Sequence, residues 1–309
     1  MANVLSVEHV ELRQLRAFLV VAEELHFGRA ADRLRVSPSR VSQLVRALET
    51  VIGASLFERT SRRVALTPIG ERLRSRVGPA CNELARAVDD LRNHRDGLTG
   101  ELRLGVVLAT NGGPYLPEII GLFEARHPAC RIVVSEITWT DPLGPLRRGE
   151  VDLTAIRFPL RQPDLVVGPV LTTDARALAV ADDHPLAGRS TVCVEDLADY
   201  EVAAGTPAIP QELIDALLPR KTPSGRPIAR RTVSGAVQTL AMVARGEIVH
   251  ATVASLPDYM SYPGITYIPI VDLPPCDAGL VWRASEETPA IRAFAAVARE
   301  VVAAVRRAA

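Results

Sequence analysis

Residues 37–49, SPSRVSQLVRALE, carry a pattern that suits an α-helix with one buried side. Ser37 can cap such a helix, and Pro38 is tolerated in its first turn, where no main-chain N–H is needed. Apolar side chains recur at the helical spacing i, i+3, i+4, i+7, at Val41, Leu44, Val45 and Leu48. The opposite face has no carboxylate and consists of Ser39, Ser42, Gln43 and Arg46. The stretch therefore predicts a helix that packs on one face and offers hydroxyl, amide and guanidinium groups on the other.

The flanking residues predict a winged helix-turn-helix. Residues 11–27 have the apolar period of a first helix, and residues 28–36 contain Ala30 and Ala31, which are small enough for close helix packing. A short helix, a tight turn and a second helix with a polar face form a helix-turn-helix. In residues 56–66, two apolar pairs bracket a basic turn, which predicts a β-hairpin that can act as a wing along phosphates.

Charge is distributed unevenly along the chain. The formal net charge is +0, with 36 Lys+Arg and 36 Asp+Glu. Residues 29–76 nevertheless hold eleven arginines and four acidic residues, an excess of seven positive charges. A basic segment on an otherwise acidic protein indicates a polyanionic partner, although a solvated charged surface would also explain the charge alone.

Residues 67–96 predict one long helix. It starts with Thr67-Pro68, a cap followed by proline, and its apolar residues alternate spacings of four and three. These residues are Leu73, Val77, Ala80, Leu84, Ala87 and Leu91. Such a heptad-like seam on a long rod needs a partner, so we expect a dimerisation helix.

From residue 97 onward, short strands alternate with helices. The strands are expected at 101–107, 130–137, 150–156, 177–181, 200–204, 265–271 and 279–284. The helices are expected near 114–126, 142–149, 209–218, 235–246 and 288–307. This alternation predicts a mainly parallel α/β fold.

Several stretches together resemble the LysR-type transcriptional regulators. They are LRQLRAFLVVAEELHFGRAADRL, VSPSRVSQLVRALE, IGASLFERTSRRVALTPIGERL, LRRGEVDLTAI and DDHPLAG, in this order along the chain. The resemblance implies a transcriptional regulator that binds a dyad-symmetric promoter site on double-stranded DNA as a homodimer or homotetramer. It also implies a response to a small-molecule effector of unknown identity, and RNA polymerase is a further candidate partner.

The resemblance also implies the domain organisation. A winged helix-turn-helix would span 10–66, a linker and dimerisation helix 67–96, and an effector-binding domain 97–309. That last domain would be α/β and similar to periplasmic binding proteins, with the effector in a cleft between two subdomains. Subdomain I would take about 97–172 and 276–309, and subdomain II about 173–275.

One departure from the family pattern affects the DNA-reading helix. Many members open this helix with Ser-Gln-Pro, whereas here Pro38 stands where the glutamine is common and Ser39 where the proline is. Arg40 can pair bidentately with a guanine, or it can hold only phosphate, and both alternatives stay open. The expected DNA-binding residues are Arg29, Ser37, Pro38, Ser39, Arg40, Ser42, Gln43, Arg46, Arg59, Thr60, Arg62 and Arg63.

Candidate effector contacts lie where strands end and helices begin, because free N–H groups there favour anions and polar groups. They are Thr110, Asn111, Thr138, Arg157, Thr206, Ser234 and Gly235. Ser or Thr before a helix can equally be a simple cap, and Arg157 can equally be a solvated loop residue.

The sequence also argues against other functions. It has no GxSxG, HExxH, P-loop or GxGxxG motif, and its six histidines are scattered, so we expect no enzyme, no cofactor and no metal. Four widely spaced cysteines predict buried or incidental thiols, with a redox sensor as the alternative. With no apolar run near ~18 residues, we expect a cytoplasmic protein without membrane contact. A small-molecule-binding protein whose winged helix no longer reads DNA remains the other alternative.

Overall fold

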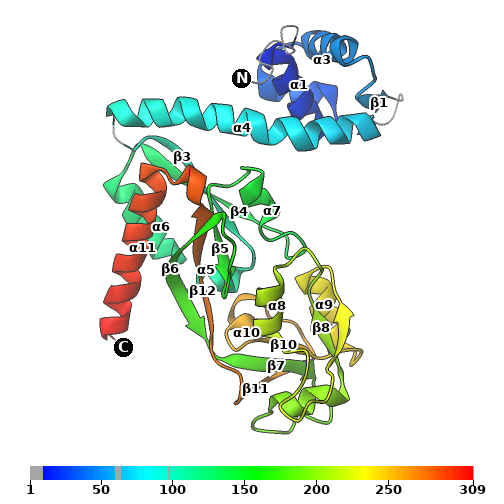
Figure 1. Cartoon of the computed structure of the whole chain (residues 1–309), viewed down its shortest axis with the longest axis vertical. Coiled ribbons are helices and arrows are strands. Elements are labelled where there is room, and N and C mark those ends of the chain that lie inside the picture. The colour runs from blue at the N-terminus through cyan, green and yellow to red at the C-terminus, as the bar shows by residue number, and fades with distance from the viewer. Residues whose placement is uncertain (1–9, 60–63, 97, 309) are drawn as a thin grey trace. The chain divides into compact units, whose positions relative to one another are not determined.

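A three-helix unit with a hairpin forms the N-terminal part of the protein. The computed structural model describes residues 10–59, 64–96 and 98–308. Its first elements are α1 (Leu12–Glu24), α2 (Phe27–Leu34), α3 (Pro38–Ile52), β1 (Phe57–Arg59) and β2 (Val64–Leu66) (Figure 1). The antiparallel pairing of β1 with β2 confirms the predicted wing. Phe18 is fully buried between the helices, and its ring centroid lies 5.5 Å from that of Phe57 in the wing.

The first helix is shorter than expected. It ends at Glu24, not at residue 27, because Leu25 adopts the left-handed conformation with φ 46°. His26 then caps α2, since its Nδ1 accepts hydrogen bonds from the N–H groups of Gly28 and Arg29. Histidine is not among the usual N-cap residues Ser, Thr, Asp and Asn, so the sequence pattern did not locate this boundary.

The long helix α4 (Pro68–Asp96) begins as predicted. The Thr67 hydroxyl accepts a hydrogen bond from the Gly70 N–H at 3.0 Å, which is an ordinary N-cap. Of the expected seam, Leu73 packs against the core of the winged helix. Leu84 remains 49% exposed, whereas the side chains of Ala87 and Leu91 lie outside the described residues. The chain divides into two compact units within this helix, between Leu91 and Arg92.

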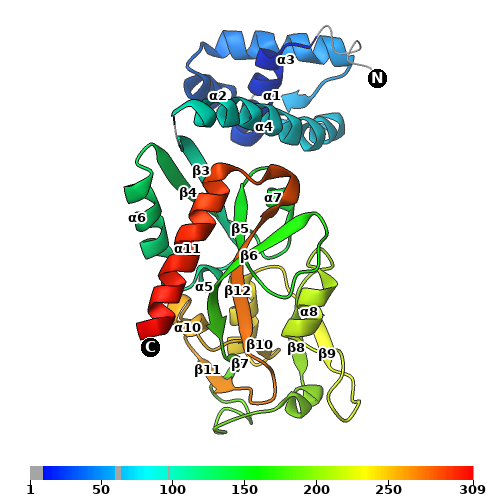
Figure 2. The ribbon, with the colours of Figure 1, turned by 60° about the vertical axis from the view of Figure 1, so that its left-hand side comes forward.

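A five-stranded sheet organises the first subdomain of the C-terminal unit. Its strand order is β4-β3-β5-β12-β6. The strands are β3 (Gly100–Val106), β4 (Cys130–Glu136), β5 (Leu153–Arg157), β6 (Leu165–Asp174) and β12 (Cys276–Arg283). Helices α6 (Leu116–Arg126) and α11 (Pro289–Ala308) pack side by side, with the rings of Phe123 and Phe294 5.4 Å apart (Figure 2).

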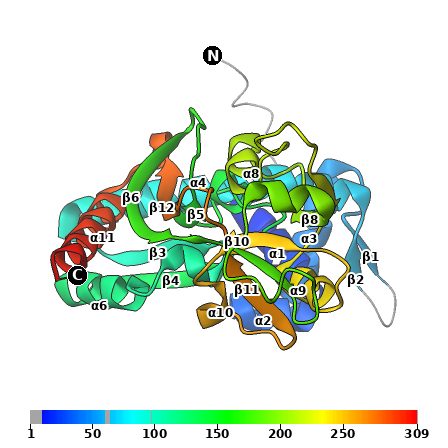
Figure 3. The same cartoon turned by 90° about the horizontal axis from the view of Figure 1, so that it is seen from below.

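The second subdomain is built around β7 (Arg176–Ala181). This strand lies between β10 (His250–Val253) and β11 (Ile265–Pro269), antiparallel to both (Figure 1). Figure 3 shows β10 and β11 from below. Beside it, β8 (Glu201–Ala204) pairs in parallel with β9 (Ala229–Thr232). The helices are α8 (Gln211–Leu217), α9 (Ala236–Ala244) and α10 (Leu256–Tyr259), with η2 (Val194–Asp199) at one end. The first subdomain contributes three further short helices, α5 (Ala109–Gly112), α7 (Gly144–Arg147) and η3 (Ala284–Glu286).

The predicted α/β architecture is confirmed, but the expectation of mainly parallel sheets is wrong. In the five-stranded sheet β3 is parallel to β4 and β5, whereas β12 is antiparallel to β5 and β6. The reason is that β12 carries the chain back from the second subdomain and so runs against β5 and β6, whereas β6 runs in the same direction as β3, β4 and β5. Strands β6, β9 and β10 were not predicted from the sequence. Among the described helices, none combines the length and the apolar character that a membrane crossing needs.

Candidate DNA-reading helix and effector cavity

The polar face of α3 is accessible along the helix. Ser37 caps the helix by accepting a hydrogen bond from the Arg40 N–H at 3.2 Å. Val41, Val45 and Leu48 are at most 1% exposed and fix the helix on its apolar side. The remaining candidates are exposed or, for Ser42, half-buried: Pro38, Ser39, Arg40, Ser42, Gln43 and Arg46. The helix therefore presents donors without any carboxylate among them.

The basic residues of this unit fall into two groups. Arg29 Nε lies 3.2 Å from Glu24 Oε2, and Arg33 pairs with Glu23 and Glu24, so these arginines already have carboxylate partners. Within the described residues, Arg40 and Arg46 form no ion pair. Their charge is available to a polyanion, whereas Arg29 could bind one only by sharing or breaking its ion pair with Glu24.

The wing supplies the remaining DNA candidates. Arg59 ends β1, and its side chain lies outside the described part of the structure. Thr60, Arg62 and Arg63, which come between β1 and β2 in the sequence, lie wholly outside the described residues.

A cavity of about 90 Å³ lies between the two subdomains of the C-terminal unit. Its walls come from the α5 region, β5 and Trp139 on one side, and from β8, α8, α9, β10 and α10 on the other. Most of its lining is apolar. The polar side chains that line it are Thr110, Asn111, Arg157, Thr239, His250 and Thr252.

Three of the seven predicted effector residues line this cavity, namely Thr110, Asn111 and Arg157. The other four, Thr138, Thr206, Ser234 and Gly235, are not part of its lining. The Thr206 hydroxyl donates to the Thr140 carbonyl at 3.1 Å, and the Ser234 hydroxyl donates to Gln238 Oε1 at 2.6 Å. Neither bond is that of a simple N-cap, since Thr206 bonds a carbonyl 66 residues away in the sequence, and α9 has no side-chain cap.

Arg157 is a buried residue that joins several elements, and not a solvated loop residue. Its guanidinium forms an ion pair of 2.6 Å with Asp174 Oδ2 at the end of β6. Nη1 donates to the Cys276 carbonyl at 2.9 Å, and Nη2 to the Thr110 carbonyl at 3.3 Å. The side chain thereby ties β5 and α5 to both strands that cross between the subdomains.

Trp139 and His250 also line the cavity, although neither was predicted as a site residue from the sequence. His250 lies on β10, a strand that was not predicted, and its Nδ1 is buried without a hydrogen-bond partner. Burial, with a smaller contribution from the nearby Arg176 cation, lowers the pKa of His250 to about 4. The imidazole is therefore neutral at pH 7. No local motif marks this histidine; only strand pairing brings it to the cavity.

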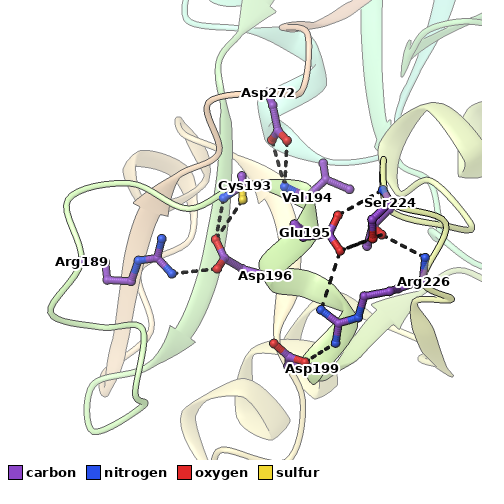
Figure 4. A network of polar contacts seen from close by, with 10 residues as sticks. Arg189, Cys193, Val194, Glu195, Asp196, Asp199, Ser224, Arg226 and Asp272 are labelled. Carbon is purple, nitrogen blue, oxygen red and sulfur yellow. Dashed lines mark hydrogen bonds and ion pairs between the residues drawn. The ribbon is translucent and has the colours of Figure 1, made fainter.

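All four cysteines are free thiols. Burial raises the pKa of Cys81, Cys130 and Cys276, which disfavours the reactive thiolate. The Cys193 thiol donates to Asp196 at 3.3 Å within the polar network that surrounds η2 (Figure 4). Within the described residues, no cluster of His, Cys, Asp and Glu could hold a metal ion.

Comparison with known proteins decides the family. The family model described as the LysR substrate binding domain matches residues 95–303, and that of the bacterial regulatory helix-turn-helix protein of the lysR family matches residues 12–71. The chain belongs to the LysR family of transcriptional regulators. It is thus a DNA-binding regulator with an effector-binding domain.

Individual relatives agree with this assignment. The chain is 30% identical to the HTH-type transcriptional regulator IlvR of Caulobacter vibrioides over 92% of its length and 95% of the relative. A probable hydrogen peroxide-inducible genes activator of Streptomyces viridosporus is 37% identical, over 59% of this chain and 57% of the relative. The fold matches that of full-length CbnR in complex with its target DNA, with a TM-score of 0.65 at 24% identity over 94% and 99% of the two chains.

Proposed function

We propose that this LysR-type regulator binds a dyad-symmetric promoter site as a dimer or tetramer, and that a small molecule in the inter-subdomain cavity changes the DNA-bound geometry. The observation that supports DNA reading most directly is the accessible, carboxylate-free face of α3 between Ser39 and Arg46. A helix of this kind in a helix-turn-helix enters the major groove, and its amino-terminal residues contact base edges.

Arg40 is the residue that we assign to base reading. It lies three residues after the Ser37 cap, in the first turn of α3, its side chain is exposed, and it forms no ion pair within the described residues. A bidentate arginine–guanine pair contributes about 1–3 kcal/mol of discrimination against other bases. Arg46 lies further along the same helix and is assigned to phosphate.

Dimerisation is assigned to α4. Leu84 on this helix keeps 49% of its surface exposed, which is unfavourable for a lone leucine in a predicted apolar seam. A two-fold pair of such helices would also give the symmetry that a dyad site requires.

The stimulus that we assign is a bound small molecule and not oxidation of a thiol. The Streptomyces relative is named for hydrogen peroxide, but in this chain burial raises the pKa of three cysteines, and the Cys193 thiol donates a hydrogen bond to Asp196. The cavity offers a site for a ligand instead. Mild peroxide treatment should leave DNA affinity unchanged; a marked change would show that a thiol is the sensor.

The decisive experiment is a footprint of the purified protein on the DNA upstream of its own gene, repeated across salt concentration. We expect protection of a dyad-symmetric site. For six to ten phosphate contacts, affinity should fall roughly 10³- to 10⁵-fold between about 50 and 200 mM salt. An affinity that barely changes with salt would refute a phosphate-contacting interface and favour a binding protein whose winged helix no longer reads DNA.

A further inference from the structure

We propose that the cavity selects a neutral, largely apolar small molecule with an oxygen acceptor for Asn111 Nδ2, such as a cyclic ketone, and discriminates against its carboxylate analogue. The proposal rests on the effector role assigned above, and it specifies the chemical class of the ligand. Three features of the cavity carry it: its charge, its unpartnered nitrogen atoms and its apolar walls.

The cavity has no free cation to receive an anion. Arg157 is the one formally charged group among the described lining residues, and its charge is compensated by Asp174 at 2.6 Å. Its Nη atoms already donate to two carbonyl oxygens. Arg176 is buried behind the wall, does not line the cavity, and donates to the carbonyl oxygens of Ala216, Leu217 and Thr252. A buried carboxylate without a free cationic partner is strongly unfavourable.

Two nitrogen atoms in the lining lack partners. Asn111 is 1% exposed, and its Nδ2 donates to no acceptor within the described structure. His250 Nδ1, from the other subdomain, is likewise buried and unpartnered. The Thr239 hydroxyl, by contrast, already donates to the Gly235 carbonyl at 2.8 Å. A buried donor that forms no hydrogen bond costs about 1–3 kcal/mol. The site therefore lacks an acceptor oxygen for Asn111 Nδ2.

The apolar part of the ligand follows from the walls. Leu108 and Trp139 face the cavity from one subdomain, and Val233, Leu240 and Met260 from the other. The volume of about 90 Å³ is smaller than the ~150 Å³ engineered cavity that accepts benzene, so the enclosed part of the ligand must be compact. A small ring with one carbonyl group is both compact and apolar, and its oxygen would accept a hydrogen bond from Asn111 Nδ2.

The test compares cyclopentanone, cyclopentane and cyclopentanecarboxylate on the purified full chain at pH 7. Trp139 reports binding by fluorescence, and Trp282→Phe removes the other of the two tryptophans, which lies in the sheet core. We expect saturable binding of cyclopentanone, and binding of the carboxylate at least about tenfold weaker. Asn111→Ala should weaken the ketone about fivefold and leave cyclopentane unchanged, because only the ketone has an acceptor.

Ser234→Ala is the matched control, since Ser234 lies near the start of α9 but outside the cavity lining, and all affinities should stay unchanged. Asn111→Asp provides a second variant, which keeps the shape but loses the donor, in case Asn111→Ala fails to fold. The proposal is overturned if the carboxylate binds as tightly as the ketone, if no probe saturates, or if Asn111→Ala weakens cyclopentane equally. The ligand-free footprint distinguishes such a failure from a failure of the DNA-binding function.

Discussion

At the scale of single residues, two buried groups shape the effector-binding unit. Arg157 ties β5 and α5 to the ends of the crossing strands through Asp174 and the Cys276 carbonyl. His250 is held as a neutral imidazole beside the Arg176 cation. Both groups have consequences for stability that can be measured without knowing the ligand.

Removing Arg157 should destabilise the protein strongly. In Arg157→Met the Asp174 carboxylate stays buried without its partner, and we expect a loss of about 3–5 kcal/mol in the free energy of unfolding of the C-terminal unit. Urea unfolding measures this change. The exposed pair of Arg226 with Asp199 is the control, because Arg226→Met should leave the free energy of unfolding almost unchanged. A change that small for Arg157→Met would show that Asp174 finds other partners.

The stability of the protein should depend on pH through His250. Its folded pKa of about 4 lies below the ordinary 6.5, so the unfolded state binds the extra proton between these values. The contribution of His250 to the free energy of unfolding is fully present above pH 6.5. It decreases as the pH falls toward 4, by up to roughly 3 kcal/mol. Denaturant unfolding at pH 7 and 5 should therefore show a smaller pH-dependent loss for His250→Gln than for the natural protein. Equal losses would show that this histidine is not responsible.

At the scale of elements, α3 has one buried apolar face and one accessible polar face. Its apolar face is buried by α1 and α2, and the Ser37 cap sets where the helix begins. The two exposed arginines on it have different positions relative to that start, which predicts different roles.

Arg40→Ala and Arg46→Ala should weaken DNA binding in different ways. We expect Arg40→Ala to relax base preference at one position, at a cost of about 1–3 kcal/mol. Arg46→Ala should weaken binding to all sequences alike and reduce the salt slope by about 1. Binding titrations on site variants at several salt concentrations separate the two effects. Arg33→Ala is the control, since Arg33 is already paired with Glu23 and Glu24. If Arg40→Ala changes only the salt slope, Arg40 contacts phosphate.

At the scale of the whole molecule, regulation requires that an effector favour one arrangement of the subdomains over another. The chain crosses between them twice, after Asp174 and before Cys276, and the cavity lies beside these crossings. A second copy of the chain is needed to convert such a change into a new geometry on a dyad site.

The α4 seam should hold that second copy. Leu84→Glu places a charge in the seam, and we expect it to shift the protein toward monomers in sedimentation velocity and to weaken DNA binding. Ser75→Glu adds the same charge to an exposed position on the opposite side of α4 and should change neither property. A Leu84→Glu protein that stays dimeric would place the dimer interface elsewhere.

Local sequence patterns were sufficient for elements whose stability is decided within one turn or one face. The capped helix at Ser37, the hairpin before Thr67 and the long helix from Pro68 each depend on neighbouring residues. The same patterns, together with the family resemblance, led to DNA binding. They did not locate the end of α1, because a left-handed Leu25 and a histidine cap are uncommon choices.

The cavity was decided by the tertiary structure. Thr110, Asn111 and Arg157 were expected from strand ends, but which strand ends meet depends on long-range pairing that no local window contains. The pairing of β10 with β7 brings His250 to the cavity, and the end of β6 brings Asp174 to Arg157. The sequence by itself thus determined the family, the winged helix and its polar face. Only the folded chain decided which polar groups remain unpaired in the cavity, because burial and partners are properties of residues far apart in sequence.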